Sequence, residues 1–352
     1  MEPLTTVRVN AGAGYEVKIG RGLLDRAGGE IRALFGGRRA MVVTDSNVAP
    51  LYLERLMRSL EEAGVPACSA VFPAGEANKN MQTLTGILNS AAEHQLTRKD
   101  YLIALGGGVC GDMTGFAAGC YMRGIPFVQI PTTVLAMVDS SVGGKCAVDL
   151  PAGKNLAGVF HQPSLVLCDL GTLDTLPAGV FSDGMAEAVK TAVLTGGDLA
   201  VRCGRRDPED LLPIIADCVR YKAGVVERDE KELGERKLLN LGHTPGHAIE
   251  KCSGYTVPHG HAVAAGLAVM ARAADARGLS DGTLGNAVEE MLKTWDLPVR
   301  TGYTAGELLE AARSDKKSAG NTITAVLPFA VGHCGLADVS FDELYELFES
   351  GI

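Results

Sequence analysis

Short β-type runs alternate with helical stretches over the first half of the chain, from residue 7 to about residue 170. The β-type runs include residues 15–19, 40–44 and 101–105, and amphipathic stretches at 51–63 and 81–94 separate them. Because strands that alternate with crossover helices pair in parallel, this pattern predicts an α/β domain built on a parallel sheet. Ligands of such sheets bind beyond the carboxyl ends of the strands, so a site is expected there.

Polar and glycine-rich segments follow several of these strands. They are Thr-Asp-Ser-Asn at 44–47, Pro-Ala-Gly-Glu-Ala-Asn-Lys at 73–79 and Gly-Gly-Gly-Val-Cys-Gly-Asp at 106–112. The glycine run follows a strand and opens a helical segment, so its amides can approach a pyrophosphate closely. It does not match Gly-x-Gly-x-x-Gly, and taken alone an ordinary tight turn explains it at least as well. Together, the segments indicate where a nucleotide would bind.

The chain becomes helical after Asp169. Amphipathic or apolar stretches cover 184–195, 208–226, 261–277, 283–295 and 305–314, and 322–328 is compatible with a short returning strand. Pro-Ala-Gly at 177–179 is the natural boundary. We therefore expect an α/β protein with an N-terminal Rossmann-like parallel-sheet domain at 1–176 and an all-helical domain at 177–352.

Composition excludes several classes of protein. A chain of 352 residues with 46% hydrophobic and 21% charged residues is globular, and a net charge of -9 argues against a nucleic-acid partner. The N-terminus lacks the pattern of a signal peptide, and no uncharged run reaches the roughly eighteen residues of a membrane helix. Nine scattered cysteines without a Cys-x-x-Cys pair are typical of reduced thiols. We expect a soluble, cytoplasmic protein with no membrane partner.

Four of the seven histidines lie between Leu239 and His261. Pro245 is tolerated only in the first turn of a helix, which predicts that Thr244 caps a helix with His243 just outside it and His247 one turn in. Both rings could then face one cavity and bind a metal ion.

Two imidazoles do not complete a catalytic metal site, so further ligands are needed. His259 is close in sequence, behind Gly254 and Pro258, and Glu187 is the best carboxylate outside the stretch. For the two helix-start histidines alone, hydrogen-bonded core residues would be the better interpretation, and His259 shifts it toward metal. The residue after the first histidine is threonine, so the stretch is not the His-Glu-x-x-His motif of zinc peptidases.

Glycine turns precede two lysines, Lys145 and Lys154. Glycine permits close backbone approach and lysine supplies a point charge, a combination that suits a phosphate, although each lysine alone is more simply a solvated surface residue. Five further basic residues, in other segments, complete the cluster that an acidic protein would need for an anionic substrate: Arg123, Lys190, Lys222, Arg236 and Lys316.

With these segments in place, the chain closely resembles the 3-dehydroquinate synthase family of sugar phosphate cyclases. The most specific parts are Pro-Thr-Thr-Val-Leu-Ala-Met-Val-Asp-Ser-Ser-Val-Gly-Gly-Lys at 131–145, Gly-Lys-Asn at 153–155, Gly-Met-Ala-Glu-Ala-Val-Lys at 184–190, Leu-Asn-Leu-Gly-His-Thr-Pro-Gly-His-Ala-Ile-Glu at 239–250 and Pro-His-Gly at 258–260. The resemblance implies Zn²⁺ or Co²⁺ on Glu187, His243 and His259, one ion per chain, with His247 left as a polar active-site group. It thereby replaces the expectation that both helix-start histidines are ligands.

The resemblance also implies NAD⁺ in the first domain and substrate binding with the metal in the second. The implied cofactor residues are Asp45, Asn47, Glu76, Lys79, Gly107, Gly108, Val109, Asp112, Thr132, Thr133, Lys154, Thr172 and Thr175. The implied substrate residues are Arg123, Asp139, Lys145, Asn155, Lys190, Lys222, Arg236, Asn240, His247 and Lys316, of which Asp139, Lys145, Lys190, Asn240 and His247 would also be catalytic.

By the same resemblance, the expected activity is that of a lyase of the shikimate pathway. It would convert 3-deoxy-D-arabino-heptulosonate 7-phosphate, a phosphorylated sugar acid, to 3-dehydroquinate and phosphate. The steps would be transient oxidation at C5, phosphate elimination, re-reduction, ring opening and aldol closure. The family also implies a homodimer in which Arg123 enters the site of the other subunit.

The chain departs from the family pattern at His261, Cys146 and residues 178–180, which places local packing in question and makes His261 a weak competitor for metal. Other functions remain open from the residues alone. A metal-dependent polyol dehydrogenase of the glycerol dehydrogenase type would share the fold but would not use the basic cluster. A sibling sugar phosphate cyclase would not need Arg236 and Lys222 for a carboxylate, and an inactive nucleotide-binding scaffold would not retain candidate residues for every step.

Overall fold

The structure is a computed structural model that describes residues 4–315 and 322–352. Its chain divides into two compact units. Unit 1 contains residues 1–176 and 222–230, and unit 2 contains residues 177–221 and 231–352. Residues 222–230 thus group with unit 1, although the sequence analysis placed them in the helical half. Each unit is described by itself.

Unit 1 is built on a seven-stranded sheet in the order β1-β2-β9-β6-β5-β3-β4. All neighbours pair in parallel except β1 and β2, which are antiparallel. The strands are β1 Thr5–Val9, β2 Tyr15–Gly20, β3 Ala40–Asp45, β4 Ala67–Phe72, β5 Tyr101–Gly106, β6 Phe127–Pro131 and β9 Leu165–Asp169.

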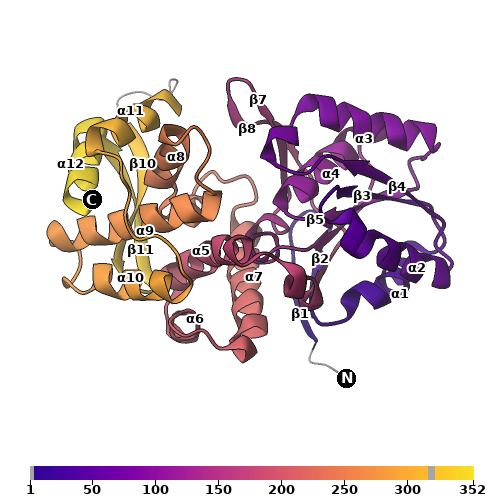
Figure 1. Ribbon diagram of the computed structural model, residues 1–352, viewed down its shortest axis with the longest axis horizontal. Coiled ribbons are helices and arrows are strands. Elements are labelled where there is room, and N and C mark those ends of the chain that lie inside the picture. Colours follow the sequence, from indigo (N-terminus) through magenta and orange to yellow (C-terminus); the bar gives the residue numbers. More distant parts are fainter. Residues whose placement is uncertain (1–3, 316–321) are drawn as a thin grey trace. The chain divides into compact units, whose positions relative to one another are not determined.

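Helices cover both faces of this sheet (Figure 1). Alternate residues of β3 and β5 point to opposite faces, so Met41 and Leu102 pack with α3 (Met81–Glu93) and α4 (Gly108–Cys120). Val42 and Ile103 pack on the other face with α1 (Leu23–Phe35) and α2 (Glu54–Glu62). A continuous hydrophobic run in each strand is therefore what a sheet covered on both faces requires. The Rossmann-like parallel sheet expected from the alternation is confirmed.

Short elements complete unit 1. They are the π-type turns η1 (Ala49–Leu53) and η4 (Ala136–Ser140), the 3₁₀ turns η2 (Glu76–Asn78), η3 (Tyr121–Arg123) and η5 (Leu170–Thr175), and a separate hairpin of β7 (Lys145–Leu150) and β8 (Gly153–Phe160). Their positions matter because most of the predicted cofactor residues lie in them or at the adjoining strand ends.

Unit 2 is organised around α9 (His259–Ala276), whose side chains are almost all buried. It contacts α5 (Ala178–Thr195), α8 (His243–Cys252), α10 (Leu284–Thr294) and α12 (Phe341–Gly351). The remaining helical elements are α6 Gly197–Cys203, η6 Pro208–Asp210, α7 Leu211–Arg228, η7 Glu235–Asn240 and α11 Ala305–Asp315. The part of α7 from Lys222 onward is grouped with unit 1.

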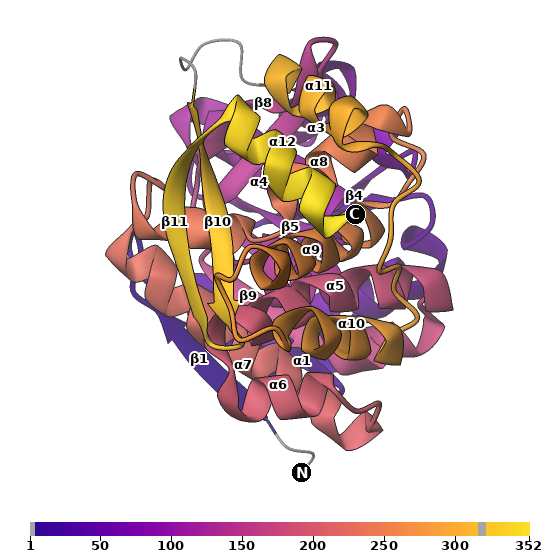
Figure 2. The same cartoon turned by 90° about the vertical axis from the view of Figure 1, so that its left-hand side faces the viewer.

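Unit 2 also contains an antiparallel hairpin of β10 (Thr322–Ala330) and β11 (His333–Ser340), which Figure 2 shows side by side. The expectation of an all-helical second half was therefore incomplete. Residues 322–328 were compatible with a strand, but β11 was not recognised. Its pattern is mostly exposed or half-buried, so it carries little apolar alternation. Among the described residues, no helix has the length and apolar character needed to cross a membrane.

Candidate metal and nucleotide sites

One carboxylate and two imidazoles converge in unit 2 and form what we call the Glu187 cluster: Glu187, His243 and His259. The Nε2 atoms of His243 and His259 lie 3.6 and 3.4 Å from Oε1 of Glu187, and one ligand atom from each residue lies within 4.8 Å of the others. Ligands bound to tetrahedral zinc at roughly 2.0–2.2 Å are about 3.4 Å apart, so these separations match ligands around one ion rather than hydrogen-bonded partners.

Helix starts aim the two imidazoles. α8 begins at His243 itself, after Gly242 in a left-handed conformation with φ 76°, and no side chain caps the helix. The predicted cap by Thr244 is therefore wrong, because a positive-φ glycine turns the chain into the helix two residues earlier. His259 begins α9 directly after Pro258. Both histidines consequently sit in first turns.

The far ring nitrogens of both histidines have acceptors. Nδ1 of His243 lies 3.2 Å from the backbone oxygen of Leu241, and Nδ1 of His259 lies 3.2 Å from Oε2 of Glu250. When Nδ1 donates its proton to these acceptors, each Nε2 keeps a lone pair for a metal ion. Glu250 was not singled out by sequence reasoning. The available signal was its place two helical turns after His243, on the same face of α8.

Glu187 is 1% exposed, and neither of its carboxylate oxygens accepts a hydrogen bond from any residue in the described ranges. Lys190, one turn further along α5, forms an ion pair with it. Although burial opposes ionisation, Lys190 and the two histidines hold the pKa of Glu187 well below its usual range. The carboxylate is thus in the form that binds metal: Lys190 pairs with its Oε2, and its Oε1 faces the two imidazoles.

The two imidazoles differ in their electrostatics. Burial, followed by repulsion from Lys190, lowers the pKa of His243 to about 3, which makes it neutral and ready to act as a ligand. For His259, burial is outweighed by the carboxylates of Glu187 and Glu250, which attract its ring protons and raise its pKa to about 10. A bound cation would take over the charge that the His259 proton otherwise supplies.

His247 and His261 do not join Glu187. His247 is exposed, and it forms a second possible ligand group with Glu250 and His259. His261 donates from its backbone amide and lies with Nδ1 against the same oxygen of Asp183, 2.9 Å in each case. It belongs to neither ligand group among the described residues. The expected competition of His261 for metal therefore has no geometric support.

The other two departures from the family pattern are local. Cys146 is buried against Gly115 of α4, where an added Cβ would overlap its sulfur. Residues 178–180 form the first turn of α5. Neither segment contains a predicted site residue.

Of the substrate residues expected in unit 2, Arg236 is 1% exposed in η7. Asn240, at the end of η7, donates from Nδ2 to Oε1 of Glu232 at 2.9 Å. Glu232, which has a left-handed φ of 60°, was also missed from sequence, since nothing in its local pattern marks it. Lys316 lies outside the described residues.

In unit 1, β5 ends in the glycine run and α4 begins within it. Gly107 is the N-cap of α4, and a Cβ added there would lie 3.1 Å from Cγ2 of Thr133. A Cβ on Gly108 would lie 3.1 Å from Oγ of Ser140. The run is therefore a tight strand-to-helix turn at a helix N-terminus, where the first amides have no acceptor within the helix, a geometry suited to a pyrophosphate. Val109 follows in the first turn of α4.

A second set, the Lys79 cluster, consists of the buried Lys79, the half-buried Asp112 and the exposed Asn155. Nζ of Lys79 lies 2.6 Å from Oδ2 of Asp112 and 2.7 Å from Oδ1 of Asn155. Burial alone would lower the pKa of Lys79, but attraction to Asp112, Glu76 and Asp149 raises it. Asn155 has a φ of 54°, and its backbone N–H donates to Oδ1 of Asp149 at 2.7 Å. The chain's own groups thus satisfy this lysine.

Further predicted cofactor residues gather around the same strand ends. Oδ1 of Asp45 accepts from the amides of Asn47 and Val48 at 2.8 and 3.1 Å. Thr132 is buried, and Lys154 lies 3.7 Å from Glu76. The hydroxyl of Tyr52, another residue missed from sequence, donates to the Thr172 oxygen at 2.9 Å and contacts Oγ1 of Thr175. A buried tyrosine therefore holds the η5 turn that carries both threonines.

The remaining substrate residues of unit 1 lie apart from the Lys79 cluster in sequence. Lys222 donates to the backbone oxygen of Asp139 at 2.6 Å and also contacts its carboxylate. Lys145 is exposed at the start of β7, and Arg123 is exposed in η3 with φ 72°.

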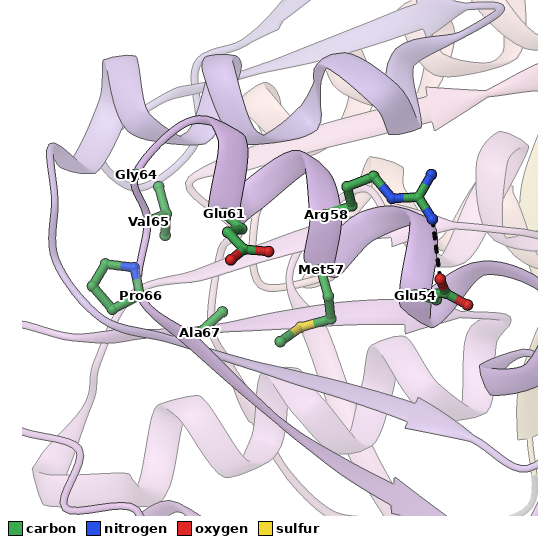
Figure 3. A pocket seen from close by; sticks show the side chains of 8 residues that line it. All are labelled: Glu54, Met57, Arg58, Glu61, Gly64, Val65, Pro66 and Ala67. Carbon is green, nitrogen blue, oxygen red and sulfur yellow. Dashed lines mark hydrogen bonds and ion pairs between the residues drawn. The ribbon is translucent and has the colours of Figure 1, made fainter.

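A pocket of about 610 Å³ lies on unit 1 between the end of α2 and the start of β4 (Figure 3). Its lining comes from one side of α2 (Glu54, Met57, Arg58 and Glu61) and from residues 64–67, and Arg58 is paired with Glu54 at 3.0 Å. It contains none of the predicted site residues, so it carries no functional assignment.

Comparison with known proteins matches two family models, 3-dehydroquinate synthase N-terminal over residues 69–183 and 3-dehydroquinate synthase C-terminal over residues 184–318. A 3-dehydroquinate synthase of Laribacter hongkongensis is 46% identical over 331 residues, covering 92% of this chain and 91% of that protein. One of Sinorhizobium medicae is 43% identical and covers 100% of each chain.

Two solved structures share the fold. A 2-deoxy-scyllo-inosose synthase complexed with carbaglucose-6-phosphate, NAD⁺ and Co²⁺ has a TM-score of 0.87 at 25% identity, over 99% of this chain and 100% of that one. The 2-epi-5-epi-valiolone synthase ValA from Streptomyces hygroscopicus subsp. jinggangensis 5008, with NAD⁺ and Zn²⁺ bound, has a TM-score of 0.86 at 28% identity, over 95% of each chain.

Proposed function

This chain belongs to the 3-dehydroquinate synthase family, and from that membership we propose how its residues divide the work of the reaction. The enzyme converts 3-deoxy-D-arabino-heptulosonate 7-phosphate to 3-dehydroquinate and phosphate. Family models that match in both halves, together with full-length relatives of one activity, support this reaction over a polyol dehydrogenase or another cyclase.

The observation that carries the proposal is the Glu187 cluster, which has three ligand atoms within 4.8 Å and both Nδ1 atoms anchored. We assign one Zn²⁺ or Co²⁺ to these residues, since solved cyclases of the same fold contain those ions. A buried, ionised carboxylate and two convergent imidazole nitrogens are the donor set that such ions take.

We assign NAD⁺ to the strand ends of unit 1. The glycine turn would hold the pyrophosphate, while Asp45, Glu76 and the Lys79 cluster surround the adjoining strand ends. When bound, the divalent ion would polarise the substrate's C5 hydroxyl and NAD⁺ would accept a hydride and return it, so that no net oxidation occurs.

The chain's own polar groups would bind the rest of the substrate. Arg236 is buried and presents a planar fork suited to a carboxylate. Lys145 and Asn155 would bind the phosphate, and Lys316 is assigned there from the family pattern. His247 is exposed beside the Glu187 cluster, with its ring centre 5.3 Å from that of His243, and is placed to hold or move a substrate proton. Lys190 supplies a positive charge beside Glu187.

We further propose that the protein acts in the cytoplasm as a homodimer. Arg123 and Met122 are both exposed in η3 with positive φ values of 72° and 48°. A strained, exposed turn that carries an arginine is a suitable element to reach a partner subunit. In solution, sedimentation should give twice the 36.8 kDa chain mass.

The test of the reaction is one cuvette followed at 340 nm with a parallel phosphate assay. Phosphate should appear one-for-one with the heptulosonate phosphate consumed, with NAD⁺ needed only in catalytic amount and no net rise in NADH. A steady NADH rise without phosphate would refute the synthase in favour of a dehydrogenase. No signal in either assay would indicate an inactive nucleotide-binding scaffold.

A further inference from the structure

Glu250 is a buried carboxylate that none of the assignments above uses. It is 3% exposed in α8, and its Oε2 lies 3.2 Å from Nδ1 of His259. A carboxylate this deeply buried is costly unless it makes a specific interaction, so its position opposite a proposed ligand calls for a physical reason.

The backbone around Glu250 holds this contact in place. Its carbonyl oxygen accepts hydrogen bonds from the Tyr255 amide at 2.7 Å and from Ser253 Oγ at 2.8 Å, which end α8 and turn the chain. Close approach of α8 to α9 adds rigidity, because a Cβ on Gly246 would lie 3.1 Å from Cα of Val263. Glu250 and His259 are therefore fixed relative to one another by the fold.

The two metal-facing histidines are held by acceptors of different kinds. His243 has a neutral backbone oxygen at its Nδ1, whereas His259 has a carboxylate. A carboxylate binds an N–H more strongly than a carbonyl and makes the opposite ring nitrogen a better electron donor.

We propose that Glu250 is a positioning residue for the metal. It keeps the proton of His259 on Nδ1, turns Nε2 toward Glu187 and strengthens His259 as a ligand. This inference rests on the proposed metal site but adds a residue that acts on the ion through another side chain.

The alternative role follows from a second possible ligand group, His247, Glu250 and His259. In that role Glu250 and Nδ1 of His259 would both be direct ligands of a second ion. The single-ion reading is favoured because Nε2 of His259 already faces Glu187 at 3.4 Å. The number of ions bound distinguishes the two roles.

The test is a Co²⁺ titration of the metal-free, full-length protein against a chromophoric chelator, with the visible Co²⁺ spectrum recorded alongside. Glu250→Gln and Glu250→Ala should each bind one ion with roughly 10- to 100-fold lower affinity, Ala being the weaker, and with shifted absorption bands. The amide oxygen of Gln can still accept from Nδ1, which explains the order. NAD⁺ affinity should not change.

Asp183→Asn is the matched control, because Asp183 holds His261 in the same way, Oδ1 to Nδ1 at 2.9 Å, outside the Glu187 cluster. It should leave Co²⁺ affinity and spectrum as in the wild type. Circular dichroism of each metal-free variant checks that the fold is retained.

Glu187→Gln separates the possible failures. If it loses the ion while both Glu250 variants bind Co²⁺ like the wild type, Glu250 has no positioning role and the metal site stands. If Glu187→Gln keeps the ion, the site itself is misplaced. A wild type that binds two ions and a Glu250→Ala variant that binds one with unchanged affinity would make Glu250 a direct ligand and overturn the proposal.

Discussion

The Lys79 cluster and the Glu187 cluster are both charged and each centres on a buried residue, but they differ in how their members meet. Lys79 has two acceptors within 2.7 Å, and neighbouring carboxylates raise its pKa despite burial. Glu187 is paired with Lys190 through Oε2, whereas the imidazole nitrogens that face its Oε1 stand 3.4 and 3.6 Å away, beyond normal hydrogen-bond length.

This difference separates two ways to build a site. A complete network is preorganised, so its ligand adds contacts without changing what holds the fold together. An incomplete set of donors is finished by the ligand, so binding energy becomes folding energy. We therefore expect the metal to stabilise unit 2 much more than NAD⁺ stabilises unit 1.

Metal removal should give the largest effect. Zn²⁺ at a thousand times its dissociation constant should stabilise unit 2 by about 4 kcal/mol, because only the folded chain gathers the ligands. Hydrogen exchange with and without a chelator measures this, and slower exchange on metal binding should centre on α5, α8 and the start of α9. Equal slowing of hydrogen exchange in β3, β5 and α4 would show that the metal does not stabilise unit 2 selectively.

Breaking the Lys79–Asp112 pair should lower the free energy of unfolding by an amount comparable to metal removal. Lys79→Met leaves Asp112 buried without its cation and should lower the free energy of unfolding by about 3–5 kcal/mol, measured by denaturant melts of the metal-loaded protein. Lys79→Met with Asp112→Leu should recover most of that loss. Lys154→Met is the matched control: its 3.7 Å pair with Glu76 is partly exposed and should cost about 0–1 kcal/mol. A Lys79 effect no larger than the Lys154 effect would show that the Lys79–Asp112 pair does not stabilise the fold.

Replacing the substrate residues should have the smallest effect on metal and cofactor binding, and the main loss should be of turnover. Lys145→Ala and Lys222→Ala should each slow the reaction by roughly 10- to 100-fold. Each variant loses one charge-assisted hydrogen bond to the substrate, which is worth about 1.5–3 kcal/mol. Metal content and NAD⁺ affinity should stay near wild type, measured by elemental analysis and cofactor titration. If either variant loses NAD⁺ affinity as badly as activity, that lysine belongs to the cofactor site.

The fold of unit 1 could be predicted from sequence because its signals are local. Alternating strands and helices predict the sheet, and the glycine run at 106–108 marks where β5 passes into α4. The helical half was predictable for the same reason. The hairpin partner β11 and the grouping of 222–230 with unit 1 depend on tertiary packing, which no local pattern reports.

For the metal site, residue types and spacing identified histidines and a carboxylate but not their arrangement. Local reasoning paired His243 with His247, and the resemblance to a known family supplied the set that the structure brings together. The cap was misplaced because Gly242 turns the chain by its backbone, without a side-chain signal. Glu250 was missed because its role depends on which ring nitrogen of His259 it faces, and that is fixed only when α8 and α9 pack together.

The most direct test of the metal site is the metal content of the purified protein, wild type against Glu187→Gln and His243→Ala. We expect one divalent ion per wild-type chain and loss of that ion in both variants, because each removes one of three converging ligands. Undiminished metal in both variants would show that the ion binds elsewhere and that the Glu187 cluster is not its site.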